Sequence, residues 1–144
     1  MPEDLFTFMM IKSHLSGKHD IIRDICNRAV DAGLEFKGGM TLHLPKNIAE
    51  QLYAEHVGKP YFEGLIESVT EAPITVALLF GKDATHTWRT LLGATDPSKA
   101  LPGTIRGDYG TELPHNACHG SDSPMSAERE RALFYSPAFI EALK

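Results

Sequence analysis

Short apolar runs of β-forming residues alternate with amphipathic helical stretches along this chain, and this alternation limits its possible folds more than any other feature. Nearly uninterrupted apolar residues predict buried strands at 4–12 and 73–81. A third strand is predicted at 34–44, where adjacent glycines interrupt the pattern. A short strand is expected near 115–119. These segments supply the strands of one sheet.

Helical spacing of apolar residues predicts helices between the strands. The expected helices occupy 20–33, 45–58, 61–72, 83–93 and about 123–134, and 94–114, rich in proline and glycine, is expected to be mostly loop. Asp20 and Asp83 are the expected N-caps, and Gly33 and Gly93 the expected C-terminal stops. This order predicts an α+β fold, a ferredoxin-like split βαβ sandwich whose four-stranded antiparallel sheet carries its helices on one face.

Length and composition favour one domain spanning residues 1–144, and they restrict the function classes. Apolar residues make up 42% of the chain and charged residues 23%, as in ordinary globular proteins. The net charge of −5 argues against nucleic-acid binding. The acidic start "MPEDLFTFMMIK" lacks the pattern of a secretory leader or membrane span, and only Cys26 and Cys118 are cysteines. We therefore expect a reduced, cytoplasmic protein that does not bind membranes.

Three kinds of site are disfavoured by motif spacing. "SGKH" (16–19) fails as a phosphate-binding P-loop, because Lys12 stands where the first glycine belongs and His19 where the hydroxyl belongs. His115, Cys118 and His119 lie close together but lack the second ligand pair of a structural zinc site. "GSDS" lacks the G-x-S-x-G pattern of a serine hydrolase.

His119 remains a candidate nucleophile, because a neutral imidazole can attack phosphorus and pass the phosphoryl group onward. Such chemistry needs positive charge on the phosphoryl oxygens, and Glu130 on the following helix is a candidate to hold the tautomer of the ring. The candidate cations are Lys12, Arg89 and Arg106, and the candidate neutral hydrogen-bonding residues are Tyr53, Thr95 and Asn116.

Two longer stretches, "GATDPSKALPGTIRGD" (93–108) and "NACHGSDSPMSAERE" (116–130), resemble the nucleoside diphosphate kinase family. The family signature N-x-x-H-G-S-D-S is met by residues 116–123, and its P-G-T-I-R-G-D by residues 102–108 without a change. Weaker similarity in "MIK" (10–12), "YAEHVGKPYFEGL" (53–65) and "WRTLLGAT" (88–95) extends the resemblance over nearly the whole chain.

The resemblance implies transfer of the γ-phosphoryl group of a nucleoside triphosphate, mainly ATP, to a nucleoside diphosphate. The family uses a ping-pong route through phosphohistidine and Mg²⁺, with Nδ1 of the histidine, here His119, as nucleophile. By resemblance, Asp122 lies near the water shell of magnesium, and Ser121 and Glu130 orient the ring. Tyr61, in place of a usual phenylalanine, and Leu65 match the clamp around the base. The residues matching the phosphate and sugar contacts are Lys12, Tyr53, Arg89, Thr95, Arg106 and Asn116.

The sequence also departs from the family pattern. The family usually reads I-K-P-D-G after the first strand, whereas this chain reads "IKSHLSGKHD". The resemblance implies a homo-oligomer. Because the chain stops soon after "FYSPAFIEALK" (134–144), without the longer tail that many members use in subunit contacts, we do not choose among dimer, tetramer and hexamer. The altered loop leaves a second function open, a divergent nucleotide-binding interaction or regulatory module without efficient turnover.

Each assignment also has a purely structural alternative. Tyr53 and Leu65 could be simple core residues, Thr95 could cap a turn, and Lys12 could be an ordinary surface lysine. Glu130 could belong to a solvated charge run, "ERER" (128–131). The remaining polar residues near these motifs are expected at the surface: His56, Lys59 and His115.

Overall fold

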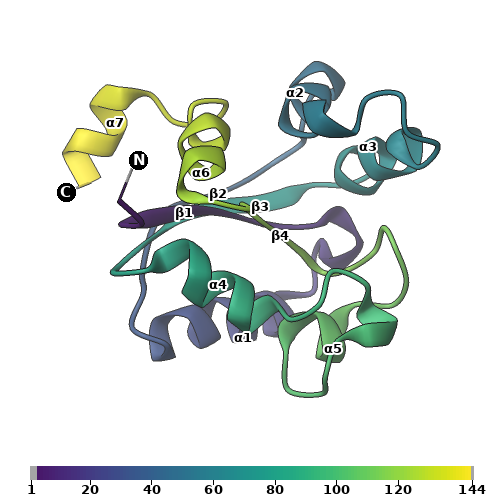
Figure 1. Cartoon of the computed structure of the whole chain (residues 1–144), viewed down its shortest axis with the longest axis horizontal. Helices are drawn as coiled ribbons and strands as arrows, with labels where there is room; N and C mark the ends of the chain where they lie inside the picture. Colours follow the sequence, from purple (N-terminus) through teal and green to yellow (C-terminus); the bar gives the residue numbers. More distant parts are fainter. Residues whose placement is uncertain (1–2, 144) are drawn as a thin grey trace.

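The computed structural model describes residues 3–143 and places helices on both faces of a four-stranded sheet (Figure 1). The strands are β1 (Phe6–Ile11), β2 (Glu35–Leu42), β3 (Ile74–Phe80) and β4 (Cys118–Gly120). The helices are α1 (His19–Asp31), α2 (Lys46–Leu52), α3 (Phe62–Thr70), α4 (Ala84–Leu92), α5 (Ile105–Tyr109), α6 (Pro124–Arg131) and α7 (Pro137–Leu143). Short 3-10 turns are η1 (Ser13–Leu15), η2 (Ala54–His56) and η3 (Pro97–Lys99).

The sheet has the strand order β2-β3-β1-β4, and every neighbouring pair is antiparallel. The expected α+β class, a ferredoxin-like four-stranded antiparallel sheet, is therefore confirmed. The register between β1 and β4 places His119 opposite Met10. In β2 the register shifts between Lys37 and Met40, where the sequence predicted an interruption at the glycines.

The expectation that the helices lie on one face is wrong. Alternate residues of β1 enter two separate cores: Phe8 packs beneath α2, α3 and α6, whereas Met9 packs against α1 and α4 on the other side. The reason is visible in the strand sequences. A strand that is apolar at nearly every position, such as 74–80, has to be covered on both faces.

Several predicted boundaries shift because of capping. Gly33, at φ +94°, ends α1 as expected, but Asp20 lies in the first turn of that helix rather than at its cap. Asp83 precedes α4 without capping it; instead Asp4 accepts the backbone N–H of Thr85 at 2.7 Å. The N-terminal segment thus satisfies the free amide groups of a helix that starts 80 residues later.

Two helices were not predicted. α5 lies inside the segment 94–114 that was expected to be mostly loop, and it forms because the Thr104 hydroxyl accepts the Gly107 N–H at 3.1 Å. α7 begins at a proline, Pro137, near the end of the chain. The helix expected at 45–58 is also shorter, since α2 ends at Leu52 and the turn η2 follows.

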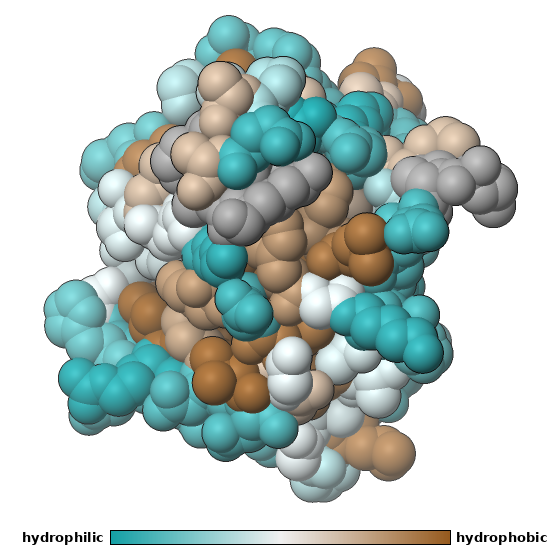
Figure 2. All heavy atoms as spheres, turned by 90° about the vertical axis from the view of Figure 1, so that its left-hand side faces the viewer, coloured by the Kyte–Doolittle hydropathy of each residue, from teal (hydrophilic) through white to brown (hydrophobic). Residues whose placement is uncertain are grey.

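The end of the molecule where β1 begins, at the left of Figure 1, is seen face-on in Figure 2, with apolar residues near the centre of the view and hydrophilic residues around them. Individual exposed apolar side chains are normal on a globular protein. Among residues 3–143, no helix is long and apolar enough to span a bilayer.

Candidate active site

A pocket of about 580 Å³ brings together residues from widely separated parts of the chain. Of the residues predicted from the sequence to catalyse the reaction or bind the nucleotide and magnesium, all but Ser121 line this pocket. They are Lys12, Tyr53, Tyr61, Leu65, Arg89, Thr95, Arg106, Asn116, His119, Asp122 and Glu130. β4 places His119 in the wall of this pocket, and α6, which follows directly, places Glu130 there. The sequence motifs therefore converge in space.

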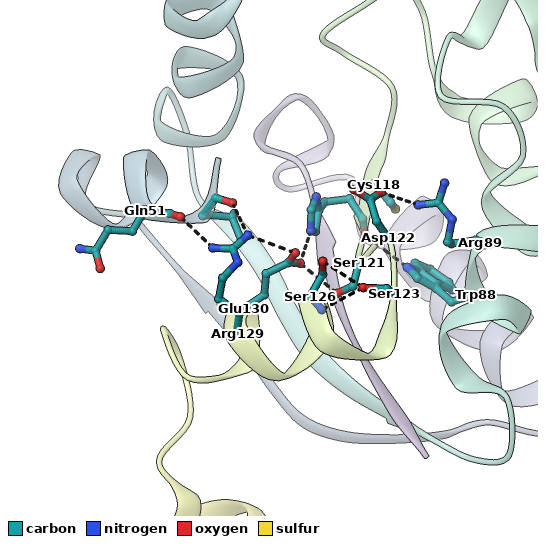
Figure 3. A network of polar contacts seen from close by, with 12 residues as sticks. Gln51, Trp88, Arg89, Cys118, Ser121, Asp122, Ser123, Ser126, Arg129 and Glu130 are labelled. Atoms are coloured by element: carbon teal, nitrogen blue, oxygen red, sulfur yellow. Dashed lines mark hydrogen bonds and ion pairs between the residues drawn. The ribbon is translucent and has the colours of Figure 1, made fainter. Parts of the chain in front are cut away.

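The His119 ring is held at one of its two nitrogens. Its Nε2 lies 2.5 Å from Oε1 of Glu130, and the Ser121 hydroxyl donates to the same oxygen at 2.9 Å (Figure 3). The Trp88 indole N–H donates to the His119 carbonyl at 3.2 Å and fixes the backbone behind the ring. Since Nε2 is engaged, Nδ1 is the nitrogen that remains for a ligand in the pocket.

Glu130 is not part of a solvated charge run. Its side chain is only 5% exposed, and its second oxygen lies 3.6 Å from the Arg129 guanidinium. Arg129 also donates to the carbonyl oxygens of Gln51 at 3.0 Å and Leu52 at 3.2 Å, at the C-terminus of α2 (Figure 3). Arg129 thereby ties α2, the helix before Tyr53, to the helix that carries Glu130. Sequence reasoning missed this role, because the partners are 77 and 78 residues away.

Two cations in the pocket are buried beside carbonyl oxygens. Lys12 is 3% exposed and donates from Nζ to the Pro114 carbonyl at 3.0 Å, so it is not an ordinary surface lysine. Burial, reinforced by the charge of Arg106, lowers the pKa of Lys12 to about 8. Arg106 donates to the carbonyls of Gly93 at 3.2 Å and Cys118 at 3.0 Å, and burial lowers its pKa as well. Positive charge buried in this way favours an anionic ligand.

The third candidate cation is placed differently. Arg89 lies on α4, its side chain is 41% exposed, and it pairs with Asp122 at 2.9 Å (Figure 3). This pair is near solvent, so breaking it costs about 0–1 kcal/mol. Arg89 can therefore turn to a ligand more easily than the two buried cations.

Buried polar atoms in the pocket lack partners. Within residues 3–143, the Tyr53 hydroxyl, Nε of Arg106 and Oδ1 of Asn116 have no hydrogen-bond partner. Burial and the Glu130 charge raise the pKa of Tyr53, so it remains a neutral donor. Asn116 donates from Nδ2 to the Thr95 carbonyl at 2.9 Å. Unsatisfied buried groups are destabilising, and a polar ligand would satisfy them.

The mouth of the pocket is lined by apolar and aromatic side chains. Tyr61 is 53% exposed, and its hydroxyl lies 2.7 Å from Nδ1 of His56, which also lines the pocket. His56 is therefore not the simple surface residue that was expected. Leu65 is half-buried at the wall, and Leu113, which sequence reasoning missed, is 53% exposed at the same pocket. No local pattern marks His56 or Leu113, because His56 ends the short 3-10 turn η2 and Leu113 lies in a loop.

One carboxylate at the pocket could take part in holding a metal ion. Across residues 3–143, no group of three or more His, Cys, Asp or Glu side chains is placed to hold a metal ion. Asp122, 72% exposed in its side chain, offers hard oxygen ligands at the pocket beside Arg89. Mg²⁺ typically binds one or two carboxylates together with water and substrate phosphates, and Asp122 fits that pattern.

Comparison with known proteins gives consistent matches over nearly the whole chain. A family model described as "Nucleoside diphosphate kinase" matches residues 6–140. A nucleoside diphosphate kinase of Staphylococcus epidermidis is 41% identical over 138 residues, which cover 96% of this chain and 92% of that protein. One from Chloroflexus aggregans is 47% identical over 118 residues, covering 81% and 78%.

Solved structures show the same likeness in three dimensions. The halophilic nucleoside diphosphate kinase of Halobacterium salinarum, solved in complex with CDP, has a TM-score of 0.88 and 41% identity, with coverage of 94% of this chain and 90% of that one. The fold and the sequence motifs therefore point to the same group of proteins.

Proposed function

The chain belongs to the nucleoside diphosphate kinase family, and from that premise we propose that it transfers the terminal phosphoryl group of a nucleoside triphosphate, mainly ATP, to a nucleoside diphosphate through His119. The observation that carries the proposal is the engagement of His119 Nε2 by Glu130 at 2.5 Å, beside a pocket that contains two buried cations. This arrangement leaves Nδ1 as the attacking atom.

The reaction consists of two displacements at phosphorus. Nδ1 of His119 attacks the γ-phosphorus, the bond from that phosphorus to the β,γ-bridging oxygen breaks, and the nucleoside diphosphate leaves with the electron pair. A terminal oxygen of a second diphosphate then attacks the phosphohistidine, and the ring nitrogen recovers its electron pair. Through both steps the proton on Nε2 stays directed at Glu130, whose negative charge stabilises the ring while it carries the phosphoryl group.

The other pocket residues bind and orient the nucleotide. Lys12 and Arg106 hold the phosphate oxygens from buried positions, and Arg89 joins them by leaving Asp122. Asp122 would hold, through water, a magnesium ion whose charge offsets that of the polyphosphate. The residues proposed to hydrogen-bond phosphate or sugar are Tyr53, Thr95 and Asn116.

Tyr61 and Leu65 are proposed to enclose the base at the mouth of the pocket. Stacking on an aromatic ring is available to every nucleobase, because each has a π-face. We therefore expect little discrimination among nucleosides.

Phosphorylation with labelled ATP tests the proposal. Wild-type protein incubated with γ-³²P-ATP and magnesium should acquire an acid-labile, alkali-stable label that moves to added GDP. His119→Ala should acquire none, and His43→Ala, which changes an exposed histidine, should behave as wild type. Absence of label on folded wild-type protein would exclude the enzymatic mechanism. ADP binding without label transfer would instead select the alternative, a nucleotide-binding regulatory module.

A further inference from the structure

Ala117 lies between Asn116 and the strand that carries His119, and its backbone is left-handed. Its φ of 73° falls in a region that residues with a Cβ seldom occupy, and its side chain is fully buried. Such a conformation persists where the surroundings hold it. Because Ala117 connects Asn116 to β4, its backbone sets the directions in which Asn116 and His119 leave the chain.

The segment after β1 holds both polar groups of this residue. The Ala117 N–H donates to Nε2 of His14 at 3.0 Å, and the Lys12 N–H donates to the Ala117 carbonyl at 2.8 Å. Lys12 also reaches the Pro114 carbonyl through its side chain at 3.0 Å. Residues 12–14 therefore fix the segment 114–117 against the end of β1.

His14 is itself fixed from its other side. Its ring meets the His115 ring edge-on, with centroids 5.3 Å apart, and Nε2 of His115 lies 3.4 Å from a Glu71 carboxylate oxygen. Burial first, and then the charges of His115, Lys12 and Lys18, lower the pKa of His14 to about 4, while Glu71 acts in the opposite direction. The ring is consequently neutral near pH 7, with an unprotonated Nε2 that can accept a hydrogen bond.

We propose that His14 is a positioning residue for phosphoryl transfer: by accepting the Ala117 N–H, it holds the backbone that presents Asn116 and His119 to the pocket. His14 lies in the stretch "IKSHLSGKHD", where the chain departs from the usual family pattern. The inference rests on the proposed function for its kinetic consequences, whereas its structural consequence, protection of the Ala117 amide, does not.

Two variants of matched size test the hydrogen bond. His14→Gln retains an acceptor at about the distance of Nε2, whereas His14→Leu fills the space and cannot accept. We expect kcat/KM for ADP to fall about tenfold in His14→Leu, because the net contribution of the one hydrogen bond that is lost corresponds to about that factor. His14→Gln should stay within about threefold of wild type, as should His43→Leu, a substitution at an exposed histidine.

Hydrogen–deuterium exchange of a peptide spanning residues 113–119 provides a readout that does not depend on activity. Its protection should fall in His14→Leu and be retained in His14→Gln. The proposal would be overturned if His14→Leu showed the kinetic constants and the exchange of the wild type. It would also be overturned if His14→Gln had a KM for ADP more than tenfold above that of the wild type, and this second test holds even if His14→Leu fails to fold. Absence of phosphotransfer by the wild type would refute the proposed function, and the exchange measurement would still decide the role of His14.

Discussion

The buried amine of Lys12 should make nucleotide affinity dependent on pH near pH 8, well below the pKa of an ordinary lysine. The pKa of Lys12 is lowered from 10.5 to about 8, first by burial and then by Arg106, which corresponds to on the order of 3 kcal/mol between the two protonation states. A bound polyphosphate supplies the negative charge that the free pocket lacks, so it returns the pKa of this amine toward its ordinary value.

The direction of the effect follows from proton uptake. Below pH 8 the amine is already protonated and binding takes up no proton, whereas above pH 8 each bound nucleotide must bring a proton to Lys12. ADP affinity should therefore weaken by about tenfold between pH 7 and pH 9. The pKa of Tyr53 is raised, and that of Cys118 is raised to about 12, so neither group titrates in this interval.

Titration calorimetry with ADP from pH 7 to 9.5, in buffers of different ionisation enthalpy, measures both the affinity and the protons taken up. Lys12→Gln should bind weakly but without this pH dependence, whereas Lys18→Gln, at an exposed lysine, should keep it. Wild-type affinity that stays constant up to pH 9.5 would refute the argument, because it would show that Lys12 is charged throughout and not desolvated.

Three further outcomes follow from single contacts. Gly107→Ala would drive a Cβ into the carbonyl of Leu101 and should lower the free energy of unfolding, measured in urea titrations, by about 2–3 kcal/mol. Gly64 has open space around it, so the control variant Gly64→Ala should not destabilise the protein. Glu130→Gln should slow single-turnover phosphorylation of the protein by about 10–100-fold with little change in ADP affinity, because the charge that stabilises the phosphorylated ring is lost. Arg129→Met should raise the KM for ADP and lower the free energy of unfolding by about 1–2 kcal/mol, because the carbonyls at the end of α2 lose their donor. Steady-state kinetics and thermal unfolding measure the two effects, and an unchanged KM would contradict a link between α2 and the pocket.

Much of the fold can be read from short-range patterns in the sequence. The run 73–81 is apolar at nearly every position, and this predicts a buried strand, although the covering of both sheet faces was not predicted. The stop at Gly33 depends on the backbone of one residue. The motif from Asn116 to Ser123 indicates phosphoryl chemistry at His119, since its spacing matches that of a known family.

Other features arise only when distant segments meet. Asp4, and not the adjacent Asp83, caps α4, and Arg129 serves the end of α2 instead of joining a solvated run. His14, which reads as a departure from the family pattern, accepts the amide of a residue 103 positions away. The physical reason is that helix and strand periodicity depends on neighbours within about four residues, whereas a polar side chain takes the partner that burial leaves unsatisfied. The sequence by itself therefore predicted most of the elements and the candidate nucleophile His119, and the tertiary structure decided which side chains hold that histidine in place.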